Sequence, residues 1–374
     1  MLSLSNVVLI LAISHGILLS IIILLKSKKF YPNFLLFLFI TSCNIILINL
    51  LYTDLKLEML FPYIPLVLDG AVYLPGPLFF LYVCSILNKE RKIKKVDLLH
   101  FLLFFIYIAF TIPDYFKPER AVVKSFLSIY SAHPPFASIL FNWTIIAQIL
   151  IYLLVSLKEV GKYHRRIRGY YSSVSNIQTT WIRGVIYLFL IGLSIFLFEN
   201  LLMSIGINFS NYFTLSSIVF GLSVYLLGYV ALIKSNTFLE IDFDYSSVKT
   251  KYRKSSLTEK DREQIASKLI ELMKSEKPFK NGALTLLDLS GMLKVSPHNL
   301  SEVLNQKLGI SFYDFINQYR AKEVKEILEI KAEKGKTLLQ IAFDCGFNSK
   351  STFNKFFKKC FGMTPSEYRK KCRG

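Results

Sequence analysis

The chain has 374 residues, 53% of them hydrophobic, and carries a formal net charge of +19. Soluble domains are about 45–50% apolar, so the composition excludes an ordinary soluble fold over the whole length. Residues 1–234 hold 9 of the 26 acidic and 19 of the 45 basic side chains. A very apolar half therefore precedes a charged half that is typical of a soluble domain.

Seven apolar runs, each about 18–25 residues long, precede residue 235, and runs of this length predict membrane-spanning helices. Helices are expected because each backbone polar group must be satisfied within the hydrocarbon. The first run is too long for a signal peptide and lacks a small-residue cleavage site. The predicted spans are 4–25, 33–52, 63–87, 97–113, 137–157, 182–206 and 212–233.

The charges of the loops predict the orientation of these spans. Basic residues gather after the first, third and fifth spans, whereas the alternate loops balance them with acids or have no charge. The excess of basic residues on the inner side predicts that the N-terminus lies outside and everything after Lys234 lies in the cytoplasm. The largest basic loop follows the fifth span, with Lys158, Lys162, Arg165, Arg166 and Arg168.

Three ionisable residues inside the spans, Asp69, Glu199 and His15, are candidates for a sensor pocket. Such groups are costly in a bilayer and usually face the bundle interior or a cavity. They either join helices or line a pocket open to the outside, which would favour a cationic or proton-coupled signal. Pro75 and Pro77 predict a kink in the third span, either as a hinge or as a static bend.

Residues 235–284 form the predicted coupler. Ser256 and Glu259 have the spacing of a capping box, which predicts the start of a helix. The helix has one apolar stripe, which either packs onto the domain that follows or forms a dimer. The stripe consists of Ile265, Leu269, Ile270 and Met273.

Residues 286–309 have the pattern of a first helix-turn-helix, in which Ser296 caps the second helix and Pro297 takes its first position. A related pattern returns with an offset of 52 or 53 residues, so Gly309 corresponds to Gly362. This is an internal repeat. A helix that starts at Ser311 joins the two units and would hold two reading heads about 34 Å apart, one turn of DNA.

In the second helix-turn-helix, Thr337 is the expected N-cap and Gly346 ends the first helix, while Ser349 caps the second helix and Gly362 ends it. The second helix directs three phenylalanines inward and leaves lysines and an asparagine outward. From Lys350 to the end of the chain there are eight basic residues and one acidic residue, Glu367. The spacing places these donors on the helix that enters a DNA major groove.

About the last 90 residues resemble the AraC/XylS-type DNA-binding domain, with Arg320 at the usual basic position of its linker helix. The matching residues of the second unit are Ile341, Ala342, Gly346, Phe347, Ser349, Phe353, Phe357, Lys358, Gly362, Thr364, Pro365, Tyr368 and Arg369. The order of domains is similar to that of membrane-bound AraC-type regulators of some bacteria. The predicted fold is all-α: a seven-helix transmembrane bundle (1–234), the coupler (235–284) and a tandem helix-turn-helix domain (285–374).

The outward faces and the resemblance together assign roles on DNA. The first helix-turn-helix is nearly neutral, so the second should supply most of the electrostatic attraction to DNA. The expected base readers are His298, Asn299, Ser301, Glu302 and Asn305 in the first unit and Ser349, Lys350, Ser351, Asn354 and Lys355 in the second. The expected phosphate contacts are Lys358, Lys359 and Arg369.

The sequence thus predicts a membrane-tethered, one-component transcriptional regulator of the bacterial inner membrane, which is not an enzyme and uses no cofactor or metal. The expected partners are double-stranded promoter DNA, the lipid bilayer, a second copy of the chain, a small-molecule or envelope signal, and RNA polymerase. The alternative is a membrane transporter or enzyme with an autoregulatory DNA-binding tail. Against it, the spans contain no HExxH, GxSxG or P-loop motif and no inverted repeat.

Overall fold

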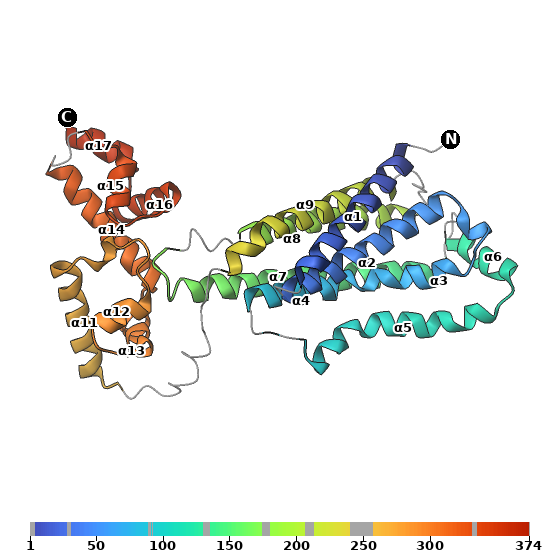
Figure 1. Ribbon diagram of the computed structural model, residues 1–374, viewed down its shortest axis with the longest axis horizontal. Helices are drawn as coiled ribbons and strands as arrows, with labels where there is room; N and C mark the ends of the chain where they lie inside the picture. The colour runs from blue at the N-terminus through green and yellow to red at the C-terminus, as the bar shows by residue number, and fades with distance from the viewer. Residues whose placement is uncertain are drawn as a thin grey trace. The chain divides into compact units, whose positions relative to one another are not determined.

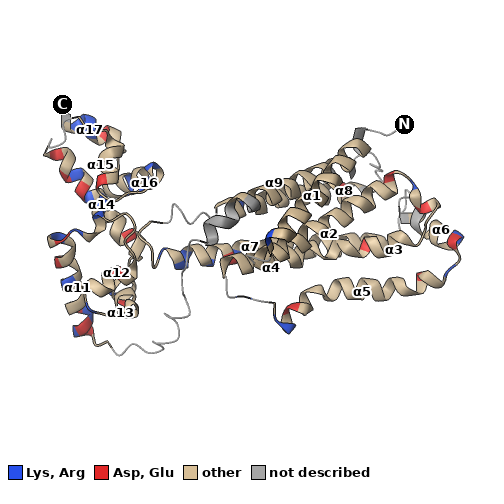
Figure 2. Cartoon of the chain, in the orientation of Figure 1, with Lys and Arg blue, Asp and Glu red and all other residues tan. Residues whose placement is uncertain are grey.

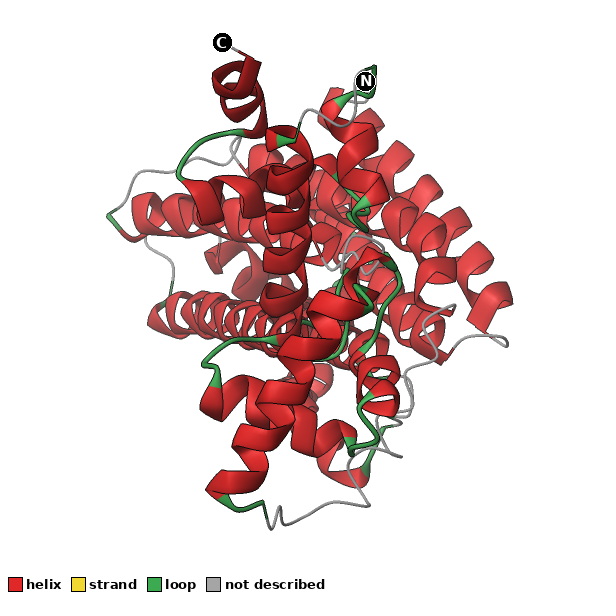
Figure 3. Ribbon diagram, turned by 90° about the vertical axis from the view of Figure 1, so that its left-hand side faces the viewer, coloured by secondary structure: helices red, strands yellow, loops and turns green. Residues whose placement is uncertain are grey.

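The computed structural model describes residues 4–27, 31–88, 91, 93–129, 135–173, 180–205, 213–239, 257–330 and 335–373. Within these ranges the regular structure is helical, and the one β-type pairing is an isolated bridge between Tyr171 and Thr285 (Figure 3). The all-helical prediction is therefore confirmed for the described residues. The chain forms two compact units, Met1–Gly161 with Thr179–Phe238, and Lys162–Gln178 with Leu239–Gly374.

Unit 1 contains most of the long apolar helices (Figure 1). Its α-helices are α1 (Leu4–Ser27), α2 (Tyr31–Asp54), α3 (Ile64–Leu68), α4 (Pro75–Leu87), α5 (Leu102–Thr111), α6 (Glu119–Ile129), α7 (Phe136–Ile167), α8 (Thr180–Ser204) and α9 (Phe213–Leu239). Its short 3₁₀ helices are η1 (Leu57–Met59), η2 (Asp69–Tyr73), η3 (Lys95–Phe101) and η4 (Ile112–Phe116). The last turns of α7 and the final residue of α9 belong to unit 2.

Five of these helical segments are long and apolar enough to cross a membrane: Asn6–Ser27, Tyr31–Asp54, Lys95–Phe116, Phe136–Ile167 and Thr180–Leu202. A sixth is a bent pair, Ile64–Tyr73 with Pro75–Leu87, whose halves meet at 40°. The bend lies where Pro75 and Pro77 predict a kink. The seventh predicted span coincides with α9, whose described part contributes a shorter apolar helix, Ile218–Val230. A bundle of seven spans therefore stays a prediction.

The core of unit 1 is built by residues from α1, α2, α4, α7, α8 and α9, with Ile23, Ile40, Val83 and Ile186 fully buried. The outside is also apolar: Leu11 is 64% exposed and Tyr229 is 55% exposed. Figure 2 shows that the middle lengths of α1, α2 and α7 carry no charged side chains. Helices that are apolar on every side are suited to a hydrocarbon environment.

Unit 2 contains two small helical heads that share one helix. Its helices are α11 (Glu259–Ser275), η5 (Pro278–Lys280), α12 (Leu286–Met292), α13 (Pro297–Glu302), a π-helical turn (Val303–Lys307), α14 (Phe312–Glu329), α15 (Leu338–Asp344), α16 (Lys350–Phe361) and α17 (Pro365–Arg373). The first half of α14 packs in the core of head 1, with α11 to α13. Its second half packs in the core of head 2, with α15 and α16.

The coupler helix α11 is part of head 1. Leu269 and Met273 are buried against α12 and α13, whereas Ile270 is 37% exposed. Of the two roles considered for the apolar stripe, the structure shows packing within the domain. The predicted helix start is wrong by two residues, because Thr258 is the N-cap and forms the capping box with Asp261. Ser256 itself lies outside the described residues.

Candidate nucleic-acid interface

Head 2 has the predicted helix-turn-helix geometry. The Thr337 hydroxyl accepts a hydrogen bond from the amide of Gln340, and the Ser349 hydroxyl accepts one from the amide of Thr352. Gly346 and Gly362 end α15 and α16 with φ of +92° and +77°, values that favour glycine. The sequence alone therefore predicted the N-caps and the C-terminal ends of both helices, α15 and α16, in head 2.

The two faces of α16 differ sharply. Phe353, Phe356 and Phe357 are at most 2% exposed and anchor the helix in the core of head 2. The opposite face is exposed and carries ammonium, hydroxyl and amide groups, and Figure 2 marks basic residues of α16 in blue. No salt bridge in the described part of the chain involves the three lysines of this face. The exposed residues are Lys350, Ser351, Asn354, Lys355 and Lys358.

Three other predicted contacts of head 2 have partners within the protein. The ammonium of Lys359 lies 3.2 Å from a carboxylate oxygen of Asp314. The guanidinium of Arg369 donates to the carbonyl of Lys336 at 2.8 Å. The hydroxyl of Ser349 caps α16. These side chains support the local structure, and their availability to DNA is lower than that of the exposed lysines.

Head 1 repeats this geometry with a wider turn. Ser296 caps α13 through the amide of Asn299, and Pro297 is its first residue, as predicted. After Glu302 the helix widens into the π-helical turn, and Gly309 follows with φ of +64°. His298, Asn299 and Ser301 are partly exposed on α13. Asn305 is exposed, but its amide donates to the carbonyl and hydroxyl of Ser301.

The prediction that Glu302 faces outward is wrong. Its side chain is 7% exposed, and one carboxylate oxygen accepts hydrogen bonds from the guanidinium of Arg262 at 2.8 and 3.0 Å. Lys307 pairs likewise with Glu259 and Glu263 of α11. Periodicity misses these pairs because they depend on how α11 packs against head 1. The charges of head 1 are thus largely neutralised within the protein.

Arg320 of α14 is fully buried and joins the two heads. Its guanidinium donates to the carbonyls of Phe279 and Asn281 at 2.8 Å each, beside the entry of head 1. A Cβ atom on Gly346 would lie 2.9 Å from its Nε, so the turn of head 2 abuts the same group. Burial lowers the pKa of Arg320 to about 10, which leaves it charged at neutral pH. It is positioned to support structure rather than to contact DNA.

Two further contacts tie the heads together. The amide of Asn348, after the turn of head 2, donates to the carbonyl of Gly282 at 3.0 Å. The Glu323 carboxylate accepts hydrogen bonds from Lys277 at 2.8 Å and pairs with Lys280 at 2.9 Å. With α14 shared by both cores, these contacts fix the relative position of α13 and α16.

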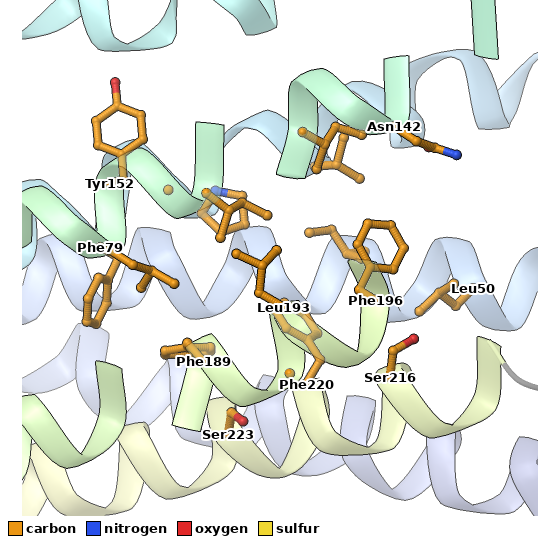
Figure 4. A pocket seen from close by; sticks show the side chains of 18 of the residues that line it. Leu50, Phe79, Asn142, Tyr152, Phe189, Leu193, Phe196, Ser216, Phe220 and Ser223 are labelled. Carbon is orange, nitrogen blue, oxygen red and sulfur yellow. The ribbon is translucent and has the colours of Figure 1, made fainter. Parts of the chain in front are cut away.

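Unit 1 contains a cavity of about 270 Å³ between α2, η2, α4, α7, α8 and α9. Figure 4 shows phenylalanines of α8 and α9 around it, with serines of α9 at its edge. Asp69 lines the cavity, and its carboxylate accepts a hydrogen bond of 2.6 Å from the amide of Asn49. The aromatic lining comprises Phe39, Phe79, Phe141, Tyr152, Phe189, Phe196 and Phe220.

Glu199 and His15 do not line this cavity. Glu199 is buried beside Ser216, which does line the cavity, and the ring of His15 lies 4.2 Å from that of Tyr225. The sequence therefore identified one residue of the cavity, Asp69. The prediction that Glu199 and His15 line the same pocket is wrong. The sequence of an apolar span does not show which faces of the helices pack together. Sequence analysis therefore did not identify the aromatic residues that line the cavity.

Comparisons with known proteins concern the end of the chain. Residues 289–371 match a family model described as a helix-turn-helix domain. The HTH-type transcriptional regulator YtdP of Bacillus subtilis is 32% identical over 90 residues, which are 24% of this chain and 11% of that protein. The melibiose operon regulatory protein of Escherichia coli K12 is 30% identical over 88 residues, 24% of this chain and 28% of that protein.

The arabinose operon regulatory protein of Escherichia coli K12 is 32% identical over 78 residues, which are 21% of this chain and 26% of that protein. The chain thus spans less than a third of the length of these relatives, and the likeness concerns a single domain. The matched segment contains α13, α14, α15 and α16 with the geometry given above. Residues 289–371 therefore form a helix-turn-helix domain that is similar to a part of these transcriptional regulators.

Proposed function

We propose that the chain is a membrane-tethered transcriptional regulator that binds promoter DNA through both heads. The observation that carries this proposal is the pair of helix-turn-helix units held together by α14 and Arg320, with a row of exposed donors on α16. Two heads fixed about one DNA turn apart would read two successive major grooves on one side of the duplex.

The surroundings of each side chain divide the predicted contacts into readers and supports. We assign base reading in head 2 to Lys350, Ser351, Asn354 and Lys355, because lysine suits guanine and asparagine suits adenine. Lys358 contacts phosphate. In head 1 the proposed readers are His298, Asn299 and Ser301. Supporting roles go to Ser349, Lys359, Arg369, Asn305 and Glu302, which are engaged within the protein.

The apolar exterior of unit 1 supports the tether. We retain the seven spans, the external N-terminus and the bacterial inner membrane as parts of the proposal. The loop after the fifth span includes Lys162–Gln178, which belongs to the same compact unit as the DNA-binding domain. This grouping supports a cytoplasmic position for that loop, in agreement with its basic residues.

We propose that the cavity around Asp69 receives the signal. Its aromatic walls suit an apolar molecule, and a carboxylate among them favours a cation or hydrogen-bond donor on that molecule. Asp69→Asn should abolish the response of target genes, whereas His15→Gln, at a residue that does not line the cavity, should preserve it. An unchanged response in Asp69→Asn would remove the cavity from the mechanism.

The regulatory function is tested by mapping the DNA sites of the full-length chain in cells, together with membrane fractionation and reporter fusions at the C-terminus. We expect the protein in the membrane fraction, a cytoplasmic C-terminus and a discrete set of promoter sites. A periplasmic C-terminus would contradict the proposal. Transport or turnover in vesicles by a chain without residues 257–374 would instead favour the alternative of a transporter or enzyme.

A further inference from the structure

One segment of unit 2 comes from a distant part of the sequence. Residues 168–172, here called the strap, directly follow α7, yet they contact α14 and the start of α12, over 100 residues later. The contacts involve both the backbone and the side chains of the strap. The strap thus binds to a surface of the DNA-binding domain within the same chain.

The backbone of the strap pairs with head 1. The amide of Leu286 donates to the carbonyl of Tyr170 at 2.8 Å, and the amide of Ser172 donates to the carbonyl of Leu284 at 3.2 Å. These bonds flank the β-bridge at Tyr171. A backbone ladder of this kind fixes the register of the strap on its partner.

Arg168 ties the strap to α14. Its guanidinium donates to both carboxylate oxygens of Asp314, at 3.0 and 2.9 Å, and lies 4.8 Å from the centre of the Tyr313 ring. The amide of Tyr313 also donates to the carbonyl of Arg168 at 3.0 Å. Both hydrogen bonds come from the same guanidinium nitrogen, Nη2, and they join opposite charges, which makes them stronger than hydrogen bonds between neutral groups.

Asp314 connects this contact to head 2, because it also pairs with Lys359 of α16. Burial by itself would raise the pKa of Asp314. The hydrogen bond from Ser311 and the cations Arg168 and Lys359 outweigh that effect and hold the pKa below its usual range. The carboxylate therefore stays ionised at neutral pH and can hold both cations.

Ser172 completes the hydrogen bonding of the buried arginine between the heads. Its carbonyl accepts from Arg320 at 3.1 Å and from the amide of Asn317 at 2.9 Å, and its hydroxyl lies 3.0 Å from a second nitrogen of Arg320. All three residues are fully buried. Removal of the strap would take two acceptors from this guanidinium, which is unfavourable for a buried charge.

We propose that the strap is a docking segment that holds the two heads in the arrangement that binds DNA, so that its release weakens binding. The docked strap leaves Lys350, Asn354 and Lys355 exposed, so docking is compatible with DNA. The inference rests on the proposed function, since it concerns regulation of the same interface. Strap docking and DNA binding should then strengthen each other, because coupling is reciprocal.

The strap also has a covalent connection to the proposed sensor. α7 is a single helix from Phe136 to Ile167, and its residues from Phe141 to Leu153 include six that line the cavity. A ligand that favours one position of α7 would bias the strap that follows it. A shift of this kind requires only that the ligand bind the two positions with different affinity.

The test uses the full-length chain in lipid nanodiscs and a duplex selected from random sequence by the unaltered chain. Arg168→Ala should weaken binding roughly tenfold, within the usual range of allosteric coupling. Arg168→Lys should fall between it and the unaltered chain, because an ammonium keeps the charge but not the planar guanidinium against the Tyr313 ring. Arg165→Ala is the matched control, since Arg165 is exposed and lies three residues earlier, in the last turn of α7.

Hydrogen exchange separates docking from DNA binding. Without DNA, the amides of Ser172, Leu286 and Tyr313 should exchange at least about tenfold faster in Arg168→Ala than in Arg165→Ala. Amides in the cores of both heads should remain protected, which shows that the heads stay folded. If they do not, Ser172→Ala, which removes only the hydroxyl, provides the same comparison. Added duplex should slow the exchange of Ser172 in the unaltered chain.

Equal DNA affinity of Arg168→Ala and Arg165→Ala, with fast exchange of Ser172 in the former, would overturn the coupling. Equal exchange in both variants would overturn the docking contact itself. If Ser172 is protected but the unaltered chain and Arg165→Ala select no duplex, the proposed function fails and the coupling fails with it. These three outcomes are distinct in the two measurements.

Discussion

The two heads share one architecture but present different charges. In head 1, Glu302 and Lys307 are paired with α11. In head 2, three lysines on α16 are exposed, and no salt bridge within the described residues uses them. The difference shows that a repeated fold does not imply a repeated role. Head 1 is suited to positioning and moderate reading, and head 2 to electrostatic attraction as well.

The two heads differ in charge but are structurally connected. α14 contributes to both cores, and Arg320 binds carbonyls at the entry of head 1 while it touches the turn of head 2. A change in one head is therefore expected to reach the other.

Gly346→Ala should produce the largest loss of stability. At φ of +92° a side chain is strained, and its Cβ would lie 2.4 Å from the carbonyl oxygen of Phe279. Strain and the displaced Arg320 hydrogen bond together should cost about 3 kcal/mol or more. Gly362→Ala is the control, because its φ is +77° but nothing lies within 4 Å. Its cost should be about 1–2 kcal/mol.

Hydrogen exchange of the core amides measures both variants. Gly346→Ala should release protection in head 2 and at the entry of head 1, whereas Gly362→Ala should affect head 2 alone. If both variants lowered amide protection to the same extent and only in head 2, the turn of head 2 would not be tied to head 1.

Asn354→Ala should cost about 1–3 kcal/mol of DNA-binding free energy and relax the preference at one base pair. The amide is exposed on α16 and suits an adenine edge. Selection of duplexes by the variant and by the unaltered chain measures both effects. A uniform loss over all sequences would assign Asn354 to phosphate contact rather than to base reading.

Glu302→Gln should lower the stability of head 1 by about 1–2 kcal/mol, because Arg262 loses a charged hydrogen-bond partner. The preferred DNA sequence should stay the same, since Glu302 is buried. Exchange of the amides of Leu300 and Leu304 reports the stability, and duplex selection reports the preference. A changed base preference would restore Glu302 as a reader.

Much of the fold of unit 2 follows from local signals. Thr337, Ser349 and Gly346 act within a few residues of their positions, so the sequence predicts the helix ends they define. Glu302 and Arg262 are 40 residues apart, and Ser172 and Arg320 are 148 apart. Such pairs depend on tertiary packing, which periodicity does not report. The cavity beside Asp69 was only partly predictable for the same reason.

The most direct test of the account is the salt dependence of DNA binding by the full-length chain in nanodiscs. Each phosphate contact contributes a slope of about 0.9 to the fall of log K with log salt. We predict that Lys358→Ala, which removes a phosphate contact, reduces this slope by roughly one, whereas Lys307→Ala in head 1 leaves it unchanged. An equal reduction by Lys307→Ala, or no binding of any duplex at low salt, would contradict the account.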